Sequence, residues 1–157
     1  MAPLIRPYTP ADTPWAAKVL TSYFGAPEVV SRGKLHDPTG LPGFIAEQDG
    51  TPQGLISYTI TGPECEIVAL VGPGTGAYLL AATVEFARNE GCHRLWLITT
   101  NDNTRALRFY QRQGWDLVAL HRDAVTRARA IKPAIPQTGE DNIPIRHELE
   151  LEFLLQA

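Results

Sequence analysis

Three glycines occur at alternate positions between residues 72 and 76, where the chain reads Gly-Pro-Gly-Thr-Gly. An apolar run at residues 65–71 precedes them, and a run with helical spacing follows. Glycines at a strand-to-helix turn leave backbone N–H groups free to face an anion, and the helix dipole adds partial positive charge there. The segment therefore predicts a pyrophosphate site, while the same residues would also suit a tight turn that binds nothing.

Two other phosphate-binding motifs fit this segment less well. Ala77 and Tyr78 stand where a P-loop requires Lys followed by Ser or Thr. A dinucleotide-binding fingerprint would use Asp102, beyond the next strand, but such a domain needs several parallel crossovers and this chain shows one. The sequence therefore gives little support for a nucleotide-dependent oxidoreductase.

A second set of residues that could carry chemistry lies further along the chain. Helical spacing places four residues on one face of a predicted helix: Asn103, Ala106, Leu107 and Tyr110. Asn103 also suits the N-cap of this helix, a common position for Asn after a strand. Tyr110, which follows Phe109, also suits a core position with its hydroxyl at the surface.

Strands and helices must position these residues, and the patterns along the chain predict both. Strands are expected at residues 4–8, 44–48, 55–60, 65–71, 94–99, 115–121 and 148–153. Helices are expected from residues 9–12 to 24, from the glycine segment to Gly91, and at residues 104–113 and 124–131. Residues 33–43 and 133–144, which are rich in Gly and Pro, are expected to be irregular.

Three local patterns give more detail. Trp15, Val19 and Tyr23 recur at helical spacing and predict the apolar face of the first helix. The pair Asp49-Gly50 predicts a tight hairpin turn, because both central residues of such a turn have positive φ. In the last strand, three glutamates alternate with apolar residues, which predicts one solvated face and one buried face; these are Glu148, Glu150 and Glu152.

The order of elements predicts an α/β fold, a mixed and mostly antiparallel central sheet with helices on both faces. One parallel crossover, from residues 65–71 through the glycine segment to residues 94–99, is expected within it. The length suits a single domain over residues 1–157, with no internal repeat.

Composition limits the classes of partner. The formal net charge is −3 and the pI is about 5.8, which gives no support for nucleic-acid binding and requires any anion site to be built locally. There is no apolar stretch of membrane-spanning length and no N-terminal secretory pattern, and two cysteines are too few for a disulfide scaffold. A cytoplasmic protein without membrane partners is expected. No metal site is expected, because the histidines are far apart.

The two sets of residues together resemble the GCN5-related N-acetyltransferase (GNAT) family. The pattern Asn-x-x-Ala-Leu-x-x-Tyr-x-x-x-Gly-aromatic, from Asn103 to Trp115, looks like the family signature after an apolar strand. The upstream segment 74–80 is similar to the family's CoA loop, with Gly-x-Gly, small residues and a pair of leucines. The resemblance is strongest over residues 65–121, and the order of elements fits over nearly the whole chain.

The resemblance implies that acetyl-CoA is the acyl donor. It implies that strands 65–71 and 94–100 splay apart, and that the pantetheine arm pairs along the exposed edge. The residues it assigns to the cofactor are Leu70, Val71, Gly72, Gly74, Thr75, Gly76, Ala77 and Asn103. A run of arginines, Arg105, Arg108 and Arg112, would either meet the 3′-phosphate of CoA or form the wet face of a helix.

The resemblance also implies direct attack by a primary amine, with three groups in support. Tyr110 would protonate the leaving thiolate as general acid, and a backbone N–H near Ala69 or Leu70 would stabilise the oxyanion. Glu66 would be the general base, although it also suits a solvated strand end. Weaker candidates for the base are Glu64, His121 and Asp123. With Asn103 contacting the pantetheine or a water, the expected catalytic residues are Tyr110, Glu66 and Asn103.

Some positions depart from the family pattern. Val71 stands where the loop usually opens with Gln or Arg, and Pro73 stands where Arg or Lys usually precedes the first glycine. The loop is also several residues shorter, so weaker CoA binding is expected, because a proline removes an N–H donor and a missing cation removes charge. The alternative is therefore a catalytically degenerate GNAT-like module that binds acyl-CoA or a protein partner.

The acceptor is expected to be a small-molecule or peptide amine. Glu140 and Asp141, in the segment 133–146 that should border the acceptor side, slightly favour a cationic one. A homodimer is possible, with the alternating last strand at its interface.

Overall fold

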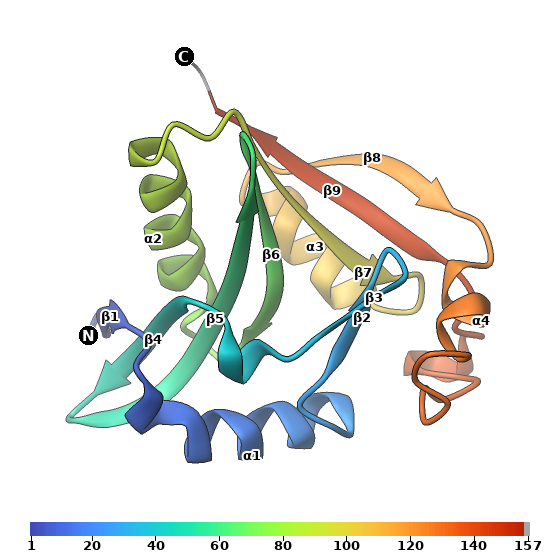
Figure 1. Cartoon of the computed structure of the whole chain (residues 1–157), viewed down its shortest axis with the longest axis horizontal. Coiled ribbons are helices and arrows are strands. Elements are labelled where there is room, and N and C mark those ends of the chain that lie inside the picture. Colours follow the sequence, from blue (N-terminus) through green and yellow to red (C-terminus); the bar gives the residue numbers. More distant parts are fainter. Residues whose placement is uncertain (156–157) are drawn as a thin grey trace.

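A seven-stranded sheet forms the centre of the computed structural model, which describes residues 1–155 (Figure 1). In spatial order its strands are β1 (Leu4–Pro7), β4 (Gly43–Gln48), β5 (Thr51–Thr61), β6 (Glu64–Val71), β7 (Arg94–Thr100), β9 (Glu148–Leu154) and β8 (Asp116–His121). Among the described strands, β6 and β7 alone pair in parallel, and every other neighbouring pair is antiparallel. The predicted mixed and mostly antiparallel sheet is therefore confirmed.

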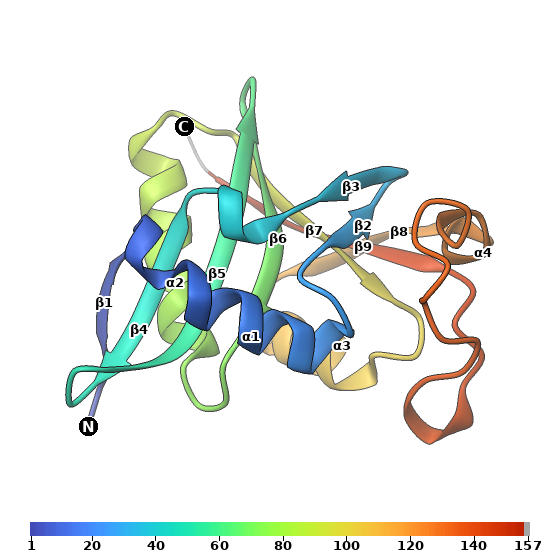
Figure 2. The same cartoon turned by 60° about the horizontal axis from the view of Figure 1, so that its bottom comes forward.

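Helices cover both faces of the sheet (Figures 1 and 2). α2 (Gly76–Asn89) and α3 (Thr104–Arg112) pack on one face, around a core that includes Leu79, Ile67 and Leu97. α1 (Thr13–Phe24) packs on the opposite face through Ala16 and Leu20. This arrangement divides the sheet into two sides, each with its own apolar cluster.

The buried face of α1 differs from the predicted one. Ala16 and Leu20 are fully buried, whereas Trp15 and Val19 are partly buried and Tyr23 is 52% exposed. One residue corresponds to about 100° around a helix, so a shift of one position turns the larger side chains to the flank. The small side chain of Ala16 contacts the sheet in their place.

The β4–β5 hairpin turns at the predicted dipeptide. Asp49 and Gly50 have φ values of 53° and 76°, the left-handed conformation that this turn requires.

The segment expected to be a loop at residues 33–43 contains regular structure. β2 (Val29–Ser31) and β3 (Lys34–His36) form a small antiparallel hairpin, and Pro38–Gly40 form a turn of 3-10 helix. The turn is made by Arg32 and Gly33, both with positive φ. Strands of three residues are too short to show an alternating pattern in the sequence, which is why the prediction was wrong here.

β6 and β7 pair over half of their length and then separate. Their ladder joins Glu64–Ile67 to Arg94–Leu97, and the strands diverge beyond it (Figure 1). A bulge accompanies the separation, because Ser57 faces Ala69 while Tyr58 faces Ile67. From Val68 onward, the edge of β6 that faces β7 is therefore without a strand partner within residues 1–155, as the predicted splay requires.

The last strand lies inside the sheet. β9 pairs with β7 on one side and with β8 on the other, so it is an interior strand of the sheet. Its glutamates do not form a solvated face: Glu148 is buried, and Glu150 and Glu152 are largely buried beside Arg94. Alternation in the sequence showed which side chains share a face, but not that other elements cover this face.

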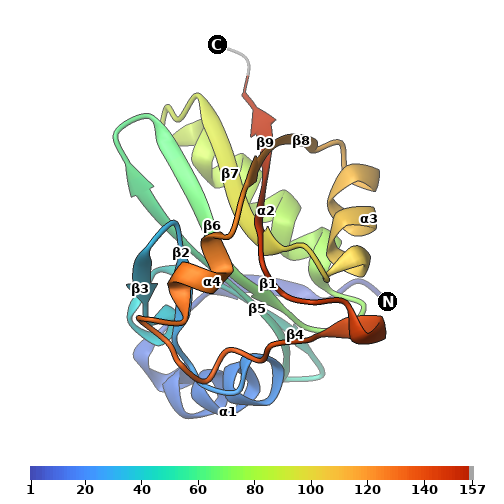
Figure 3. The same cartoon turned by 90° about the vertical axis from the view of Figure 1, so that its right-hand side faces the viewer.

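The segment between β8 and β9 is mostly irregular, as predicted (Figure 3). It contains the short helix α4 (Ala124–Ala128) and a 3-10 turn at Glu140–Asn142. Asn101, after β7, fixes the C-terminal end of this segment. Its side chain donates a hydrogen bond to the carbonyl of Pro144 and accepts hydrogen bonds from the N–H groups of Arg146 and His147. Within residues 1–155, no helix is both long enough and apolar enough to cross a membrane.

Candidate functional site

The glycine loop between β6 and α2 is formed by close contact between two backbones. A Cβ on Gly72 would lie 2.4 Å from the Cα of Gly54, and a Cβ on Gly54 would lie 2.1 Å from Thr75 Oγ1. Thr75 Oγ1 donates a hydrogen bond to the carbonyl of Gly72 at 3.0 Å, which closes the turn. Gly74 has φ 76° and lies at the exposed tip. The loop therefore has one tightly fixed side and one open side.

The open side adjoins the first turn of α2. The N–H groups of Gly76, Ala77 and Tyr78 have no partner within residues 1–155, as expected for the first turn of a helix. The side chain of Val71 is buried against the sheet and α1, so only its backbone can face this space. Free N–H groups at a helix N-terminus, next to glycines without Cβ atoms, fit a pyrophosphate.

α3 lies against the start of α2, and Asn103 is its N-cap residue. The side chain of Asn103 accepts a hydrogen bond from the N–H of Ala106 at 3.2 Å, so it has the capping role considered above. Phe109 covers Gly76, where a Cβ would lie 3.1 Å from the Phe109 ring. The two predicted sets of residues are thus next to one another in space.

Tyr110 faces the interior from α3. Its ring packs against Phe109 and Trp115, with centroids 5.1 and 5.7 Å away. Within residues 1–155 its hydroxyl makes no hydrogen bond, although no fully enclosed side-chain oxygen or nitrogen there lacks a partner. The hydroxyl therefore retains some exposure. Burial raises the pKa of Tyr110, so the group stays protonated at neutral pH.

A basic pocket lies on the outer side of α3. It has a volume of about 320 Å³ and is lined by Arg105, Arg108, Phe109, Arg112 and Gln113. Phe109 contributes to it and also contacts Gly76. The three arginines are therefore on the same side of the molecule as the free N–H groups of α2.

Glu66 lies on the opposite face of the sheet, under the β2–β3 hairpin. Ser31 Oγ donates to Glu66 Oε2 at 2.6 Å, and His36 Nε2 is 3.9 Å from Oε1. Burial raises the pKa of Glu66, opposed by the hydrogen bond from Ser31 and the charge of Lys34 and assisted by two carboxylates of β9. Glu66 is 8% exposed, so the prediction of a solvated strand end does not hold.

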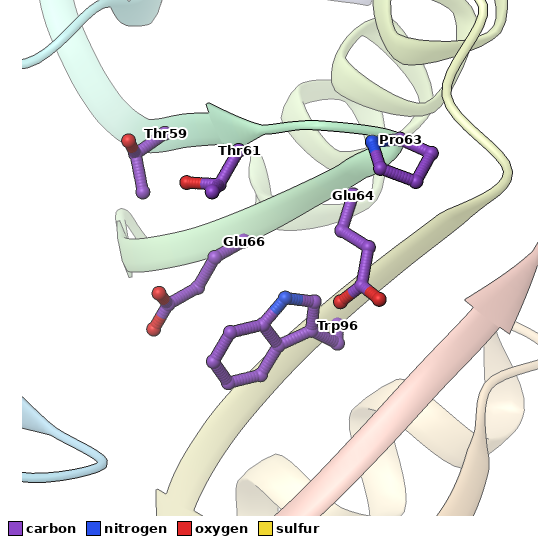
Figure 4. Close-up of a pocket in the computed structure, with 6 residues that line it drawn as sticks. All are labelled: Thr59, Thr61, Pro63, Glu64, Glu66 and Trp96. Atoms are coloured by element: carbon purple, nitrogen blue, oxygen red, sulfur yellow. The ribbon is translucent and has the colours of Figure 1, made fainter.

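A pocket of about 400 Å³ opens beside Glu66 (Figure 4). Its lining comes from β5, β6, the turn between them, and β7: Thr59, Thr61, Pro63, Glu64, Glu66 and Trp96. The indole of Trp96 lies between the carboxylate ends of Glu66 and Glu64 (Figure 4). Arg94 lies over the Trp96 ring, with its guanidinium 5.6 Å from the ring centre.

Other expected site residues have structural partners instead. His121 pairs with Glu150, and Asp123 pairs with Arg146. Neither residue lines the pocket beside Glu66. Glu140 lies 3.6 Å from Arg105, and neither Glu140 nor Asp141 lines the pocket beside Glu66.

The sequence analysis missed Ser31, His36, Arg94 and Trp96. Trp96 could have been found, because a parallel register between residues 64–67 and 94–97 sets it beside Glu66. Ser31 and His36 carried no such signal, because they come from a hairpin more than 25 residues away in the chain.

Comparison with known proteins agrees with this geometry. Residues 8–115 match the acetyltransferase (GNAT) family. The uncharacterized protein YdhI of Bacillus subtilis (strain 168) is 39% identical over 143 residues, covering 85% of this chain and 89% of that protein. The chain therefore belongs to the acetyltransferase (GNAT) family, which confirms the predicted resemblance and the predicted class of enzyme.

Solved structures share the fold. One is the IAA acetyltransferase from Bacillus cereus ATCC 14579, with a TM-score of 0.75 and 20% identity over 97% of this chain and 99% of that one. Another is a GNAT family acetyltransferase from Elizabethkingia anophelis with acetyl-CoA bound, with a TM-score of 0.67 and 19% identity over 97% of both chains.

Proposed function

We propose that this protein transfers an acetyl group from acetyl-CoA to a primary amine, with residues 1–157 acting as one catalytic domain. The observation that carries the proposal is the splay of β6 and β7, with the glycine loop on one side and the buried Glu66 on the other. A donor and an acceptor can approach such a gap from opposite sides of the sheet. The acetyl-CoA bound to the relative from Elizabethkingia anophelis supports this choice of donor.

Backbone groups would hold the donor. The N–H groups of Gly76 and Ala77 suit the pyrophosphate, with Gly72, Gly74 and Thr75 shaping the loop. The free edge of β6, at Leu70 and Val71, suits the pantetheine amides. Arg105, Arg108 and Arg112 add positive charge on the same side and suit the remaining phosphate. Asn103 combines its capping role with an amide N–H₂ that has no partner within residues 1–155 and suits the pantetheine or a water.

Glu66 would accept the proton of the amine. A carboxylate whose pKa is raised by burial is a stronger base than one in water, and Glu66 faces the acceptor pocket. Acetyl-CoA supplies the acetyl group in activated form when it is bound. A backbone N–H near Ala69 or Leu70, beside the bulge, would stabilise the developing oxyanion.

Tyr110 would donate a proton to the leaving sulfur. Its raised pKa keeps the hydroxyl protonated, and the hydroxyl has no competing partner within residues 1–155. Glu66 and Tyr110 lie on opposite faces of β6, so the acid and the base would not compete for one proton.

A second candidate is a GNAT-like module that binds acyl-CoA or a partner without catalysis. The side chain of Val71 is buried and Pro73 has no N–H, so the loop has fewer donors and cations than the family pattern. This composition favours weak binding. A cytoplasmic location is part of the first proposal, supported by the two free thiols of Cys65 and Cys92. A homodimer remains a prediction.

Titration of the purified protein with acetyl-CoA, and separately with NADH, tests the proposal by thermal shift and calorimetry. Stabilisation by acetyl-CoA alone, followed by turnover of an amine, is expected, because a ligand of the native state raises its stability. Binding without turnover over a broad panel of amines would favour the second candidate. Absence of any response to acetyl-CoA would exclude both.

A further inference from the structure

The acceptor side of the sheet carries more negative than positive charge. Five carboxylates gather over β6 and β9 and around the hairpin: Glu64, Glu66, Glu148, Glu150 and Glu152. Three permanent cations accompany them, Arg32 at Glu148, Lys34 near Glu66, and Arg94 between the remaining three. The guanidinium of Arg94 is therefore shared by three carboxylates, and the surroundings of the pocket carry a net negative charge.

Glu66 has a free oxygen at this pocket. Its side chain is nine-tenths buried, and its Oε2 is occupied by Ser31. Oε1 accepts no hydrogen bond within residues 1–155, and Nε2 of the His36 ring is 3.9 Å away. Burial lowers the pKa of His36, which keeps that ring neutral at pH 7. Because no fully enclosed side-chain oxygen within residues 1–155 lacks a partner, Oε1 keeps some exposure to the pocket, where a ligand can supply the missing donor.

Glu64 offers a second free oxygen on the same face. Arg94 contacts its Oε1 at 3.0 Å, whereas Oε2 accepts no hydrogen bond within residues 1–155. Side chains two positions apart on a strand share a face about 6.7 Å apart. The indole of Trp96 lies between these two carboxylates (Figure 4). Its ring already attracts the guanidinium of Arg94, and an aromatic ring has two faces on which a cation can lie.

We infer that the acceptor is a short aliphatic diamine, with its reacting amine at Glu66 and its second, protonated amine held between Glu64 and Trp96. The inference rests on the proposed acetyl transfer. Five bonds of about 1.5 Å, in an extended zigzag, span roughly the spacing of alternate residues along a strand, from which the two side chains extend, and this corresponds to a chain of about four carbons. The hydroxyls of Thr59 and Thr61 line the rest of the pocket and accept hydrogen bonds from ammonium groups.

This arrangement selects against carboxylates. An amino acid of the same length would place its carboxylate beside Glu64, where the like charges repel each other. A monoamine of the same length would fill the pocket but leave Oε2 of the half-exposed Glu64 to water instead of to an ammonium group. The expected order of preference is therefore diamine, then monoamine, then amino acid.

The test compares 1,4-diaminobutane, butylamine and 4-aminobutanoate, which differ mainly in the terminal group. The kcat/KM for the diamine should exceed that for the monoamine by about ten-fold, the ratio expected for a hydrogen bond to a charged group. In Glu64→Gln this ratio should fall towards one. Glu85→Gln, on the exposed side of α2, is the matched control and should keep the wild-type ratio.

Binding of the same three compounds is measured by calorimetry in the presence of CoA, so that the outcome does not depend on turnover. Tighter binding of the diamine than of butylamine, lost in Glu64→Gln, supports the inference even if no product forms. In that case the proposed catalysis fails and the assignment of the pocket stands. If the diamine binds no more tightly than butylamine and is turned over no faster, the inference is overturned. If butylamine is nevertheless acetylated, the proposed acetyl transfer is supported without the preference for a diamine.

Discussion

Glu66 is held by an uncharged donor. The nearest strong contact of its carboxylate is the hydroxyl of Ser31, at 2.6 Å, and not a cation. A buried carboxylate paired with arginine would lose basicity, because the cation stabilises its charged form. A hydroxyl orients the carboxylate with a smaller effect of the same sign. The residue is therefore positioned without losing its capacity to accept a proton.

Ser31→Ala should move the pH dependence of the reaction. The hydrogen bond from Ser31 lowers the pKa of Glu66, so its loss raises that pKa further. Because the proposed base acts as a carboxylate, the acidic limb of kcat/KM against pH should shift to higher pH. Ser22→Ala, at an exposed position of α1, should leave the limb in place. A shift to lower pH would contradict the role given to Ser31.

Tyr110→Phe should lower kcat by about 100-fold, the usual size of a lost general acid. The ring contacts with Phe109 and Trp115 are kept, so the midpoint of thermal unfolding should change little. Steady-state kinetics with acetyl-CoA measures the effect. Tyr23→Phe, 52% exposed on α1, serves as control. An unchanged kcat with a raised KM for acetyl-CoA would assign Tyr110 to binding instead.

The glycine loop is positioned by β5 as much as by its own sequence. Gly54, near the start of β5, gives Thr75 and Gly72 the room to close the turn. The loop is therefore an element that depends on two strands. The shape of the proposed phosphate site thus depends on Gly54, a position that carries no phosphate-binding pattern.

Gly54→Ala should distort the loop. Its new Cβ would lie 2.1 Å from Thr75 Oγ1 and 3.1 Å from the carbonyl oxygen of Val71. The expected loss of stability is about 1 to 3 kcal/mol, the usual cost of overpacking, together with weaker binding of acetyl-CoA. Gly40→Ala is the matched control, since no atom lies within 4 Å of the added Cβ. Urea denaturation and calorimetry measure both effects, and equal behaviour of the two variants would refute the argument.

Over the whole molecule, Arg94 joins strands from distant parts of the chain. It contacts Glu64 of β6 at 3.0 Å and Glu152 of β9 at 2.6 Å, and it also pairs with Glu150. The C-terminal strand is thus tied to the middle of the chain by charge as well as by its ladder. The pKa of Glu150 is lowered because hydrogen bonds from His121 and Arg94 outweigh the opposing effect of burial.

Arg94→Leu should destabilise the protein in a pH-dependent way. A carboxylate with a lowered pKa contributes stability above its unfolded value, near 4.5, and loses it as the pH falls through the folded value. Removing Arg94 should therefore cost about 2 kcal/mol of unfolding free energy at pH 7, and much less at pH 3. Arg88→Leu, in an exposed pair, should stay within about 0.5 kcal/mol at both values. Denaturant titrations at the two pH values decide the point, and a pH-independent loss would show that Arg94 acts by packing.

Local patterns predicted the parts of the fold that depend on neighbours in sequence. The hairpin at Asp49-Gly50, the glycine loop before α2 and the helix from Thr104 each follow from residues within a few positions of one another. The face of α1 was misassigned by one position, because the choice between Trp15 and Ala16 depends on how closely a helix can approach the sheet.

The sequence by itself determined the family, the mixed sheet with one parallel crossover, and the identity of Glu66 and Tyr110 as candidates. It did not determine that Glu66 is buried, that Ser31 and His36 lie over it, or that the glutamates of β9 surround Arg94. The pairing of strands far apart in the chain decides which side chains share a face and which elements cover it. The surroundings of Glu66 were therefore set by tertiary structure, because they are made of residues that meet only when the sheet is complete.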